Sequence, residues 1–269
     1  RLGSLRRAAD AAEARVRDAA RRAMQDASAG GYTMSGELVM RGTRLCIPVR
    51  AGARRRVPGI VHDRSGTGGT LFVEPMAVVE AGNELAEALL AQGGADLALH
   101  LRAPDTSGGA LHRLTSALRG PAGEAGALLV VNDRVDAALA AGADGVQLGS
   151  RSLAADDLPP AAAHLARGAS VHSALEAGRA GGVDWLLVGT LWETSSHPGR
   201  PGAGLGRLGE VAAVHPAPRI GIGGITPERA AEALAAGAHG VAVLGGVWRD
   251  PDPRAALARY LSVLATGSR

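Results

Sequence analysis

Two glycine pairs near the C-terminal end of the sequence are the first residues that suggest a binding chemistry. Gly223-Gly224 and Gly245-Gly246 each follow a short apolar run. Glycine lets backbone N–H groups approach an anion closely, and a helix that begins just after such a loop adds a favourable dipole. A single pair is explained equally well by a glycine that ends a strand. Two successive pairs favour a phosphate site.

Polar residues that suit proton transfer or ring binding follow earlier apolar runs. His172 ends one run, where an imidazole is either a proton shuttle near neutral pH or a structural side chain. Asn132 and Asp133 end another run, where they bind a metal, bind an amino-heterocycle or cap the following helix. The loop 189–199 is rich in hydroxyl groups and either covers a ligand or is a solvated surface loop. The candidate ligand-contacting side chains beside His172 and in this loop are Ser170, Thr194, Ser196 and His197.

Alternating strands and helices must position these residues. Ala- and Leu-rich stretches of helical length separate seven short apolar runs, which predicts βα units and parallel strands. The regular spacing favours a TIM (β/α)8 barrel that lacks one strand over a doubly wound open sheet. In such a barrel the loops after the last two strands commonly bind phosphate. The expected strands lie at 97–101, 128–131, 145–148, 169–171, 185–188, 220–222 and 240–244.

The first 93 residues follow a different pattern, which predicts a small α+β segment. A charged, Ala-rich stretch at 1–29 predicts a solvated helix or a coiled-coil arm. The Gly- and Ser-rich stretch 65–70 is either an anion cradle or, more simply, a plain turn. Short strands are expected at 37–40, 45–49, 59–62 and 71–75, followed by a helix at 76–90.

The composition excludes several kinds of site. The sequence contains no lysine, so a Walker A loop and a Schiff-base lysine are impossible. The single cysteine, Cys46, excludes an intrachain disulfide, and we expect its thiol to be buried and inert. No apolar run approaches the roughly 18–20 residues that span a bilayer, and a cytoplasmic protein is the default expectation. The net charge of +3 gives little support for nucleic acid binding.

Four longer strings in the barrel region occur in a fixed order: VNDRVDAALAAGADGVQLGSRSL, SVHSALEA, VDWLLVGTLWETSSHPG and IGIGGITPERAAEALAAGAHGVAVLGGV. In that order they resemble the thiamine-phosphate synthase and TenI family over residues 94–262. The resemblance implies a (β/α) barrel enzyme of thiamin biosynthesis that binds a small phosphorylated thiazole. The family normally opens with a strand ending near Thr-Asp, and no equivalent stands before residue 97. The barrel is therefore expected to start one strand late or to take a strand from the N-terminal region.

Two activities in this family need different residues. The synthase joins a pyrimidine diphosphate to thiazole phosphate with magnesium, and its pattern contains Gln-Leu-Arg-x-Lys, an Asn-Asp pair, a second metal-binding Asp and a late Lys. In this sequence the first motif begins with His100 and keeps Arg102, without the Lys. Ser152 stands at the second metal position and His197 stands at the late Lys. The Asn-Asp pair remains.

The TenI branch converts a thiazole carboxylate phosphate to its aromatic tautomer without a metal, and the resemblance places its acid/base histidine at His172. We therefore expect a TenI-like thiazole tautomerase with no cofactor. The alternative is a thiamine-phosphate synthase that binds magnesium through Asp133. No membrane partner is expected, and a homo-oligomer is compatible with the sequence. The residues expected to contact the phosphorylated thiazole are Arg102, Asn132, Asp133, Ser170, Thr194, Ser196, His197, Gly223, Gly224, Gly245 and Gly246.

The string VPGIVHDRSGTGGTLFVEPMAVVEAGNEL, with the helix before it, resembles the core domain of type-two MutS-like ATPases over residues 1–92. We therefore divide the chain into a MutS-like core fragment at 1–93 and a barrel at 94–269. Without a Walker A lysine, the fragment is expected to be a relic, a fusion junction or a docking module. The second alternative function is a non-catalytic module that contacts DNA through the arginines at 54–56, although nucleic acid is not the expected partner.

Overall fold

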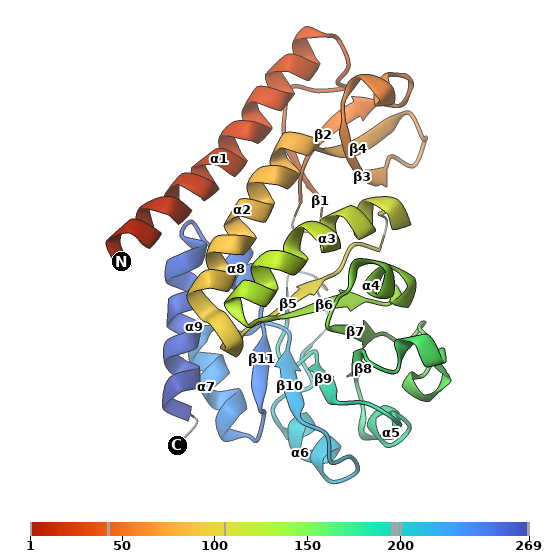
Figure 1. Cartoon of the computed structure of the whole chain (residues 1–269), viewed down its shortest axis with the longest axis vertical. Helices are drawn as coiled ribbons and strands as arrows, with labels where there is room; N and C mark the ends of the chain where they lie inside the picture. The colour runs from red at the N-terminus through yellow and green to blue at the C-terminus, as the bar shows by residue number, and fades with distance from the viewer. Residues whose placement is uncertain (1, 42–43, 105, 195–198, 200, 268–269) are drawn as a thin grey trace.

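A small N-terminal segment stacks on a curled parallel sheet (Figure 1). The computed structural model describes residues 2–41, 44–104, 106–194, 199 and 201–267. The N-terminal segment begins with α1 (Leu2–Ala29) and continues as an antiparallel sheet in the order β1-β2-β4-β3. Its strands are β1 (Val39–Arg41), β2 (Arg44–Arg50), β3 (Gly59–Arg64) and β4 (Thr70–Pro75), and the 3-10 helix η1 (Ala51–Arg56) follows β2.

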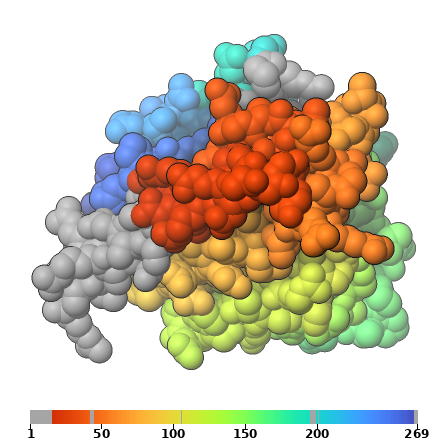
Figure 2. All heavy atoms as spheres, turned by 90° about the horizontal axis from the view of Figure 1, so that it is seen from above, coloured from red at the N-terminus to blue at the C-terminus, as the bar shows by residue number. Residues whose placement is uncertain are grey.

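One face of this small sheet packs against α1. Ile47 of β2 lies opposite Val73 of β4, and both side chains are fully buried with Met24 of α1. Leu71 and Val73, two residues apart on β4, therefore share the covered face, as the two-residue period of a strand requires. Cys46 is buried and forms no disulfide among the described residues, as the sequence predicts. Figure 2 shows α1 lying across this end of the molecule.

Local hydrogen bonds hold the turn at 65–70 and the loop that contains Arg54. The 65–70 stretch is a hairpin turn, because the backbone N–H of Ser65 donates to the Thr70 carbonyl and Ser65 Oγ accepts from the Thr70 N–H. The turn thus uses its own donors, which favours the plain turn over an anion cradle. The Arg54 guanidinium donates to the carbonyls of Val57 and Gly59, so it supports the loop before β3.

The second sheet contains seven parallel strands in the order β11-β10-β9-β8-β7-β6-β5. All seven strands expected from the sequence are confirmed, together with the curled α/β architecture (Figure 1). The strands are β5 (Ala98–Leu101), β6 (Leu128–Asn132), β7 (Gly145–Leu148), β8 (Ala166–Val171), β9 (Trp185–Gly189), β10 (Arg219–Ile222) and β11 (Gly240–Ala242). The helices are α3 (Gly108–Ala125), α4 (Val135–Ala141), α5 (Ala174–Gly178), α6 (Gly206–Ala212), α7 (Pro227–Ala235), α8 (Gly245–Trp248) and α9 (Pro253–Gly267).

The connection between β7 and β8 is the one place where the βα repeat has no α-helix. It contains two short 3-10 helices, η3 (Ala155–Asp157) and η4 (Pro160–Ala162). Pro159 and Pro160 explain the difference, because proline removes a backbone donor and disfavours helical geometry in the residue before it.

Helix α2 (Met76–Gly93) joins the two parts of the molecule, and η2 (Gly94–Asp96) leads from it into β5. Val78 packs against α1, in the cluster that also contains Ala19 and Ala20. Leu90 packs against α3 and β5, and Leu89 belongs to the cluster that contains residues of α7 and α9. A helix that is apolar around most of its circumference must be buried on several sides, and α2 is therefore part of both cores.

The parallel sheet does not close through backbone hydrogen bonds. Within the described residues, β5 and β11 each pair with one neighbour only. Trp248 packs against the hydrophobic clusters of both sheet ends. Gln92 of α2 donates to the Arg254 carbonyl at 3.0 Å and accepts from Arg254 Nε at 2.9 Å. Side-chain contacts between α2 and α9, together with Trp248, thus connect the elements next to the two sheet ends.

No helix among the described residues is long and apolar enough to cross a membrane.

Candidate functional site

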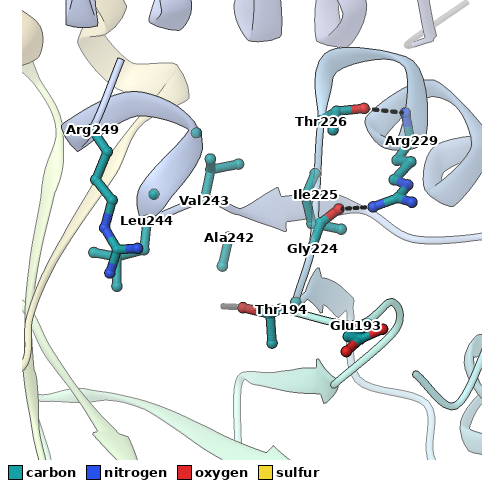
Figure 3. A pocket seen from close by; sticks show the side chains of 13 residues that line it. Glu193, Thr194, Gly224, Ile225, Thr226, Arg229, Ala242, Val243, Leu244 and Arg249 are labelled. Atoms are coloured by element: carbon teal, nitrogen blue, oxygen red, sulfur yellow. Dashed lines mark hydrogen bonds between the residues drawn. The ribbon is translucent and has the colours of Figure 1, made fainter. Parts of the chain in front are cut away.

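The two glycine pairs line one cavity at the C-terminal ends of β10 and β11 (Figure 3). The cavity has a volume of about 390 Å³, which is within the usual size for small-ligand sites. Gly223 and Gly224 follow β10, and Gly245 and Gly246 open α8 directly after β11. Thr194 also lines the cavity, from the loop that follows β9.

Glycine is required at both positions of the β10 loop. Gly223 has φ of 101° and Gly224 has φ of 64°, and residues with side chains rarely adopt such values. A Cβ on Gly224 would lie 2.5 Å from the Glu193 carbonyl oxygen, and a Cβ on Gly223 would overlap Thr190. The β10 loop therefore packs directly on the β9 loop, which brings backbone groups from both loops to the cavity.

Two arginines give the cavity a positive character. Arg229 of α7 donates to the Gly224 carbonyl at 2.8 Å, and its guanidinium lies 5.3 Å from the centre of the Trp192 ring. Arg249 follows α8, and its side chain lies on the opposite side of the cavity (Figure 3). The Glu193 side chain also lines the cavity. The two guanidinium groups outweigh its single negative charge, and with the glycines they suit a phosphate.

A second polar region lies on the inner face of β5 to β8. His100 Nε2 lies 3.0 Å from Asn132 Oδ1, and Gln147 Nε2 lies 3.1 Å from Ser170 Oγ. Gln147 also accepts from Trp185 Nε1 at 2.8 Å. These side chains come from five adjacent strands, β5 to β9, and outward-facing neighbours on β5 to β7 pack under the helices. The inner face thus offers several hydrogen-bonding groups to a heterocycle.

Hydrogen bonding assigns the proton on His100. Asn132 Nδ2 donates to Asp133, so Asn132 Oδ1 is the acceptor and His100 Nε2 must carry a proton. Burial lowers the pKa of His100, although the hydrogen bond to Asn132 opposes that shift. The imidazole is therefore held neutral at physiological pH, with its Nδ1 lone pair available as an acceptor.

Asp133 has an unusual backbone conformation, and three protein groups donate hydrogen bonds to its carboxylate. Its φ is 60°, a left-handed conformation that is uncommon for a residue with a side chain and occurs often at functional sites. Its carboxylate accepts from Asn132 Nδ2, from Ser152 Oγ and from the Gly149 N–H. The strained backbone therefore places the carboxylate across the ends of β6 and β7.

Asp133 is the carboxylate that a magnesium ion could use at the ends of β6 and β7. Magnesium takes oxygen ligands in octahedral geometry, commonly from one or two carboxylates. Asp133 already accepts three protein donors, and Ser152 is a hydroxyl that donates to it. Among the residues that the structure describes, no three His, Cys, Asp or Glu side chains form a cluster that could hold a metal. Magnesium held by one or two carboxylates and by substrate oxygens does not require such a cluster.

His172 lies at the end of β8 beside the start of α5. Its Nδ1 lies 3.1 Å from Glu176 Oε2, its backbone N–H donates to the same oxygen at 2.8 Å, and its side chain is 60% exposed. Burial acts against ionisation of Glu176, but the hydrogen bonds from His172 outweigh it and lower the pKa of that carboxyl. An ionised Glu176 favours a proton on Nδ1, which leaves Nε2 free to exchange a proton with a ligand.

Comparison with known proteins connects this geometry to a family. The family model described as thiamine monophosphate synthase matches residues 71–247. The chain belongs to this family. The match begins at β4, so it includes α2 as well as the parallel sheet. The chain is thus a member of an enzyme family that acts in thiamin biosynthesis, as the sequence motifs imply.

Two similar curated relatives are thiamine-phosphate synthases. The chain is 41% identical over 175 residues to the thiamine-phosphate synthase of Methanoculleus marisnigri. The aligned region covers 62% of this chain and 81% of that protein. It is 41% identical over 179 residues to the thiamine-phosphate synthase of Roseiflexus castenholzii, covering 65% and 78%. These names favour the synthase over the tautomerase that the residue pattern predicts.

Solved structures agree with the fold. A thiamine phosphate pyrophosphorylase from Pyrococcus furiosus aligns with a TM-score of 0.61 and 32% identity, covering 68% of this chain and 90% of that one. A 3-hexulose-6-phosphate synthase from Salmonella typhimurium aligns with a TM-score of 0.54 at 16% identity, which indicates a shared fold alone.

The expected site residues that the structure describes lie in the glycine-lined cavity, in the polar region at β6 to β8, or just after β5. The four glycines and Thr194 share one cavity. Asn132, Asp133 and Ser170 lie in the polar region over β6 to β8, while His172 pairs with Glu176 beside it. Arg102 is exposed just after β5, and Ser196 and His197 lie outside the described residues.

One expectation about the Asn-Asp pair is wrong. Neither Asn132 nor Asp133 caps α4, because the N-cap residue is Arg134, which makes no side-chain cap hydrogen bond. The left-handed turn at Asp133 directs its carboxylate to Ser152 and Gly149 instead.

The sequence also failed to identify three residues that shape the site. Arg229 and Arg249 line the cavity, and Gln147 belongs to the inner polar face together with His100, which the family motif includes. Gln147 had a detectable signal, since it is a polar residue inside an otherwise apolar strand.

Proposed function

We propose that this chain binds a thiazole carboxylate phosphate and converts it to its aromatic tautomer, as a TenI-like thiazole tautomerase. The observation that carries the proposal is that Asp133 is bonded to Asn132, Gly149 and Ser152, with Ser152 in place of the second metal-binding carboxylate of the synthase pattern. A site with one carboxylate is less suited to magnesium and diphosphate than a site with two. A tautomerisation needs neither a metal nor a second substrate, so it suits the residues that are present.

The phosphate would bind at the glycine pairs of the β10 and β11 loops. Backbone N–H groups that open α8 and the guanidinium of Arg249 supply donors and positive charge there. The thiazole ring would then extend toward the inner polar face, where Asn132 and Ser170 offer hydrogen-bonding groups. Thr194 of the β9 loop would close over the ligand.

His172 is the proposed acid and base. One C–H bond of the substrate breaks as Nε2 accepts the proton, and the electron pair moves through the conjugated system. A new C–H bond forms at another carbon when the imidazolium returns a proton. Protons and electrons balance without an oxidant, and Glu176 stabilises the imidazolium between the two steps.

A thiamine-phosphate synthase is the second candidate, and a specific observation favours it. The relatives are named thiamine-phosphate synthase, and the Asn132-Asp133 pair of the synthase pattern is retained at the end of β6. In that reaction magnesium would neutralise the leaving diphosphate, with Asp133 as a protein ligand.

One assay separates the two reactions. Purified protein is incubated with the thiazole tautomer alone, and then with pyrimidine diphosphate, with magnesium or with EDTA. Tautomer conversion that is unaffected by EDTA supports the proposal. Formation of thiamine phosphate only when magnesium and pyrimidine diphosphate are both present would establish the synthase instead.

We also propose that the chain is organised as a MutS-like segment at 1–93 and a barrel at 94–269 that share α2. The contacts of α2 with α1 on one side and with α3 and α9 on the other support this arrangement. All three tryptophans, Trp185, Trp192 and Trp248, lie in the barrel. Tryptophan fluorescence therefore reports barrel unfolding, while circular dichroism reports both parts. The two urea transitions should coincide, and clearly separate midpoints would contradict a shared helix.

A further inference from the structure

Tyr260 lies behind both phosphate loops. It belongs to α9, is 4% exposed, and its hydroxyl donates to the Ile225 carbonyl at 2.9 Å. Ile225 directly follows Gly224 in the β10 loop. The same hydroxyl is the nearest atom to the position that a Cβ on Gly246 would occupy. One phenol oxygen therefore lies against both the β10 loop and the β11 loop, and Tyr260 is not among the residues that line the cavity.

The Tyr260 hydroxyl acts as a hydrogen-bond donor in this contact. Burial raises the pKa of Tyr260, while the nearby Arg259 acts in the opposite direction. The phenol therefore remains protonated over the physiological range and donates to Ile225. Arg259 pairs with Asp250 at 2.6 Å, so it does not compete for the phenol oxygen.

Gly246 is constrained by this contact and not by its backbone conformation. It is absent from the glycines with positive φ, in contrast to Gly223 and Gly224. A Cβ at Gly246 would overlap Tyr260 Oη and would lie 3.1 Å from Val243 Cγ1 and 3.3 Å from Tyr260 Cζ. The phenol oxygen is thus the main obstacle to a side chain at this position.

We propose that Tyr260 is a positioning residue that fixes the separation of the two phosphate-binding loops and so determines affinity for the phosphate group. It acts through the Ile225 carbonyl and through contact with Gly246, and it does not touch the ligand. The inference rests on the phosphate site of the proposed function. It predicts that Tyr260 affects binding of the phosphate and leaves the proton-transfer step unchanged.

The test compares Tyr260→Phe with Tyr32→Phe, the matched substitution at the other tyrosine of the chain. Tyr32 lies in the N-terminal segment, far from the loops in sequence and fold. Calorimetry with thiazole phosphate should show binding weaker by about three- to tenfold in Tyr260→Phe, the loss expected for one hydrogen bond. KM should rise by the same factor while kcat changes little, and Tyr32→Phe should match the wild type.

A second pair of variants keeps the inference testable if Tyr260→Phe lowers stability. Gly246→Ala alone should weaken phosphate binding by about tenfold or more, because the methyl group meets the phenol oxygen. Adding Tyr260→Phe removes that oxygen, so the double variant should bind more tightly than Gly246→Ala. Such rescue requires direct coupling between the two residues.

The outcomes are distinguishable. If the wild type fails to bind thiazole phosphate, the phosphate site and the inference are both overturned. If the wild type binds it, but Tyr260→Phe binds equally well or the double variant shows no rescue, the role of Tyr260 is overturned while the phosphate site stands.

Discussion

Replacing His172 by glutamine separates proton transfer from ligand binding. The wild-type imidazole has Nδ1 3.1 Å from Glu176 Oε2 and is 60% exposed. A glutamine amide can donate to the same carboxylate, so the loop should keep its geometry. It cannot exchange a proton at neutral pH. General acid–base catalysis contributes roughly 10²- to 10⁴-fold, and we expect kcat for tautomer conversion to fall by that factor.

Binding should be almost unchanged in the same variant, because the phosphate site lies on other loops. Tautomer conversion is followed by NMR, and the dissociation constant for thiazole phosphate is measured by calorimetry. His164→Gln is the matched control, since His164 is exposed and lies between η4 and β8. Full activity in His172→Gln would refute the proton shuttle. An equal loss in the His164 control would show that the effect is not specific.

Three further changes test other parts of the structure. Gly224→Ala should weaken phosphate binding by at least about tenfold, or about 1.4 kcal/mol, because the new Cβ would lie 2.5 Å from the Glu193 carbonyl at φ of 64°; an unchanged calorimetric affinity would contradict the close packing. Leu90→Ala should lower the free energy of unfolding in urea by about 2–5 kcal/mol, because Leu90 is 2% exposed; a loss below about 1 kcal/mol would show that α2 is not part of the core. The depressed pKa of Glu176 means that its stabilising contribution is complete above the ordinary carboxyl pKa and is lost as the pH falls through the lower folded value. Thermal midpoints should therefore fall more steeply in that acidic range for the wild type than for Glu176→Gln, and parallel curves would contradict the assignment.

Most of the parallel strands could be predicted because each contains a short apolar run that ends at a glycine or polar turn. β6 (Leu128–Asn132) and β9 (Trp185–Gly189) both have this form. A parallel sheet covered by helices needs such runs. The two glycine pairs were equally informative, since their order along the chain puts them at neighbouring strand ends.

The hydrogen bonds of the site could not be predicted, because they depend on residues far apart in the chain. Asp133 meets Ser152 only after β6 and β7 pair and the backbone at Asp133 adopts its left-handed turn. The wrong expectation of a helix cap at this residue came from local sequence alone. Arg249 was missed for a similar reason, since its place opposite Arg229 exists only when the β10 and β11 loops lie side by side.

The double role of α2 was visible in part. Val78, Val79, Leu85 and Leu89 occupy more of its circumference than one buried face requires. That pattern indicates a helix packed on several sides. It does not say which elements surround the helix, and only the folded chain shows that one of them is α1.

The way the sheet ends are joined has a consequence for folding. Each parallel strand pairs with its neighbour in the sequence, so the sheet can grow one βα unit at a time without a costly long-range strand pairing. The side-chain contact between Gln92 of α2 and Arg254 of α9 joins residues that are 162 positions apart in the sequence. Because side chains can open without breaking a ladder of backbone bonds, the amides of β5 and β11 should exchange with deuterium sooner than those of β7. The two ends of the sheet would thus separate first, while the strands in the middle of the sheet stay folded.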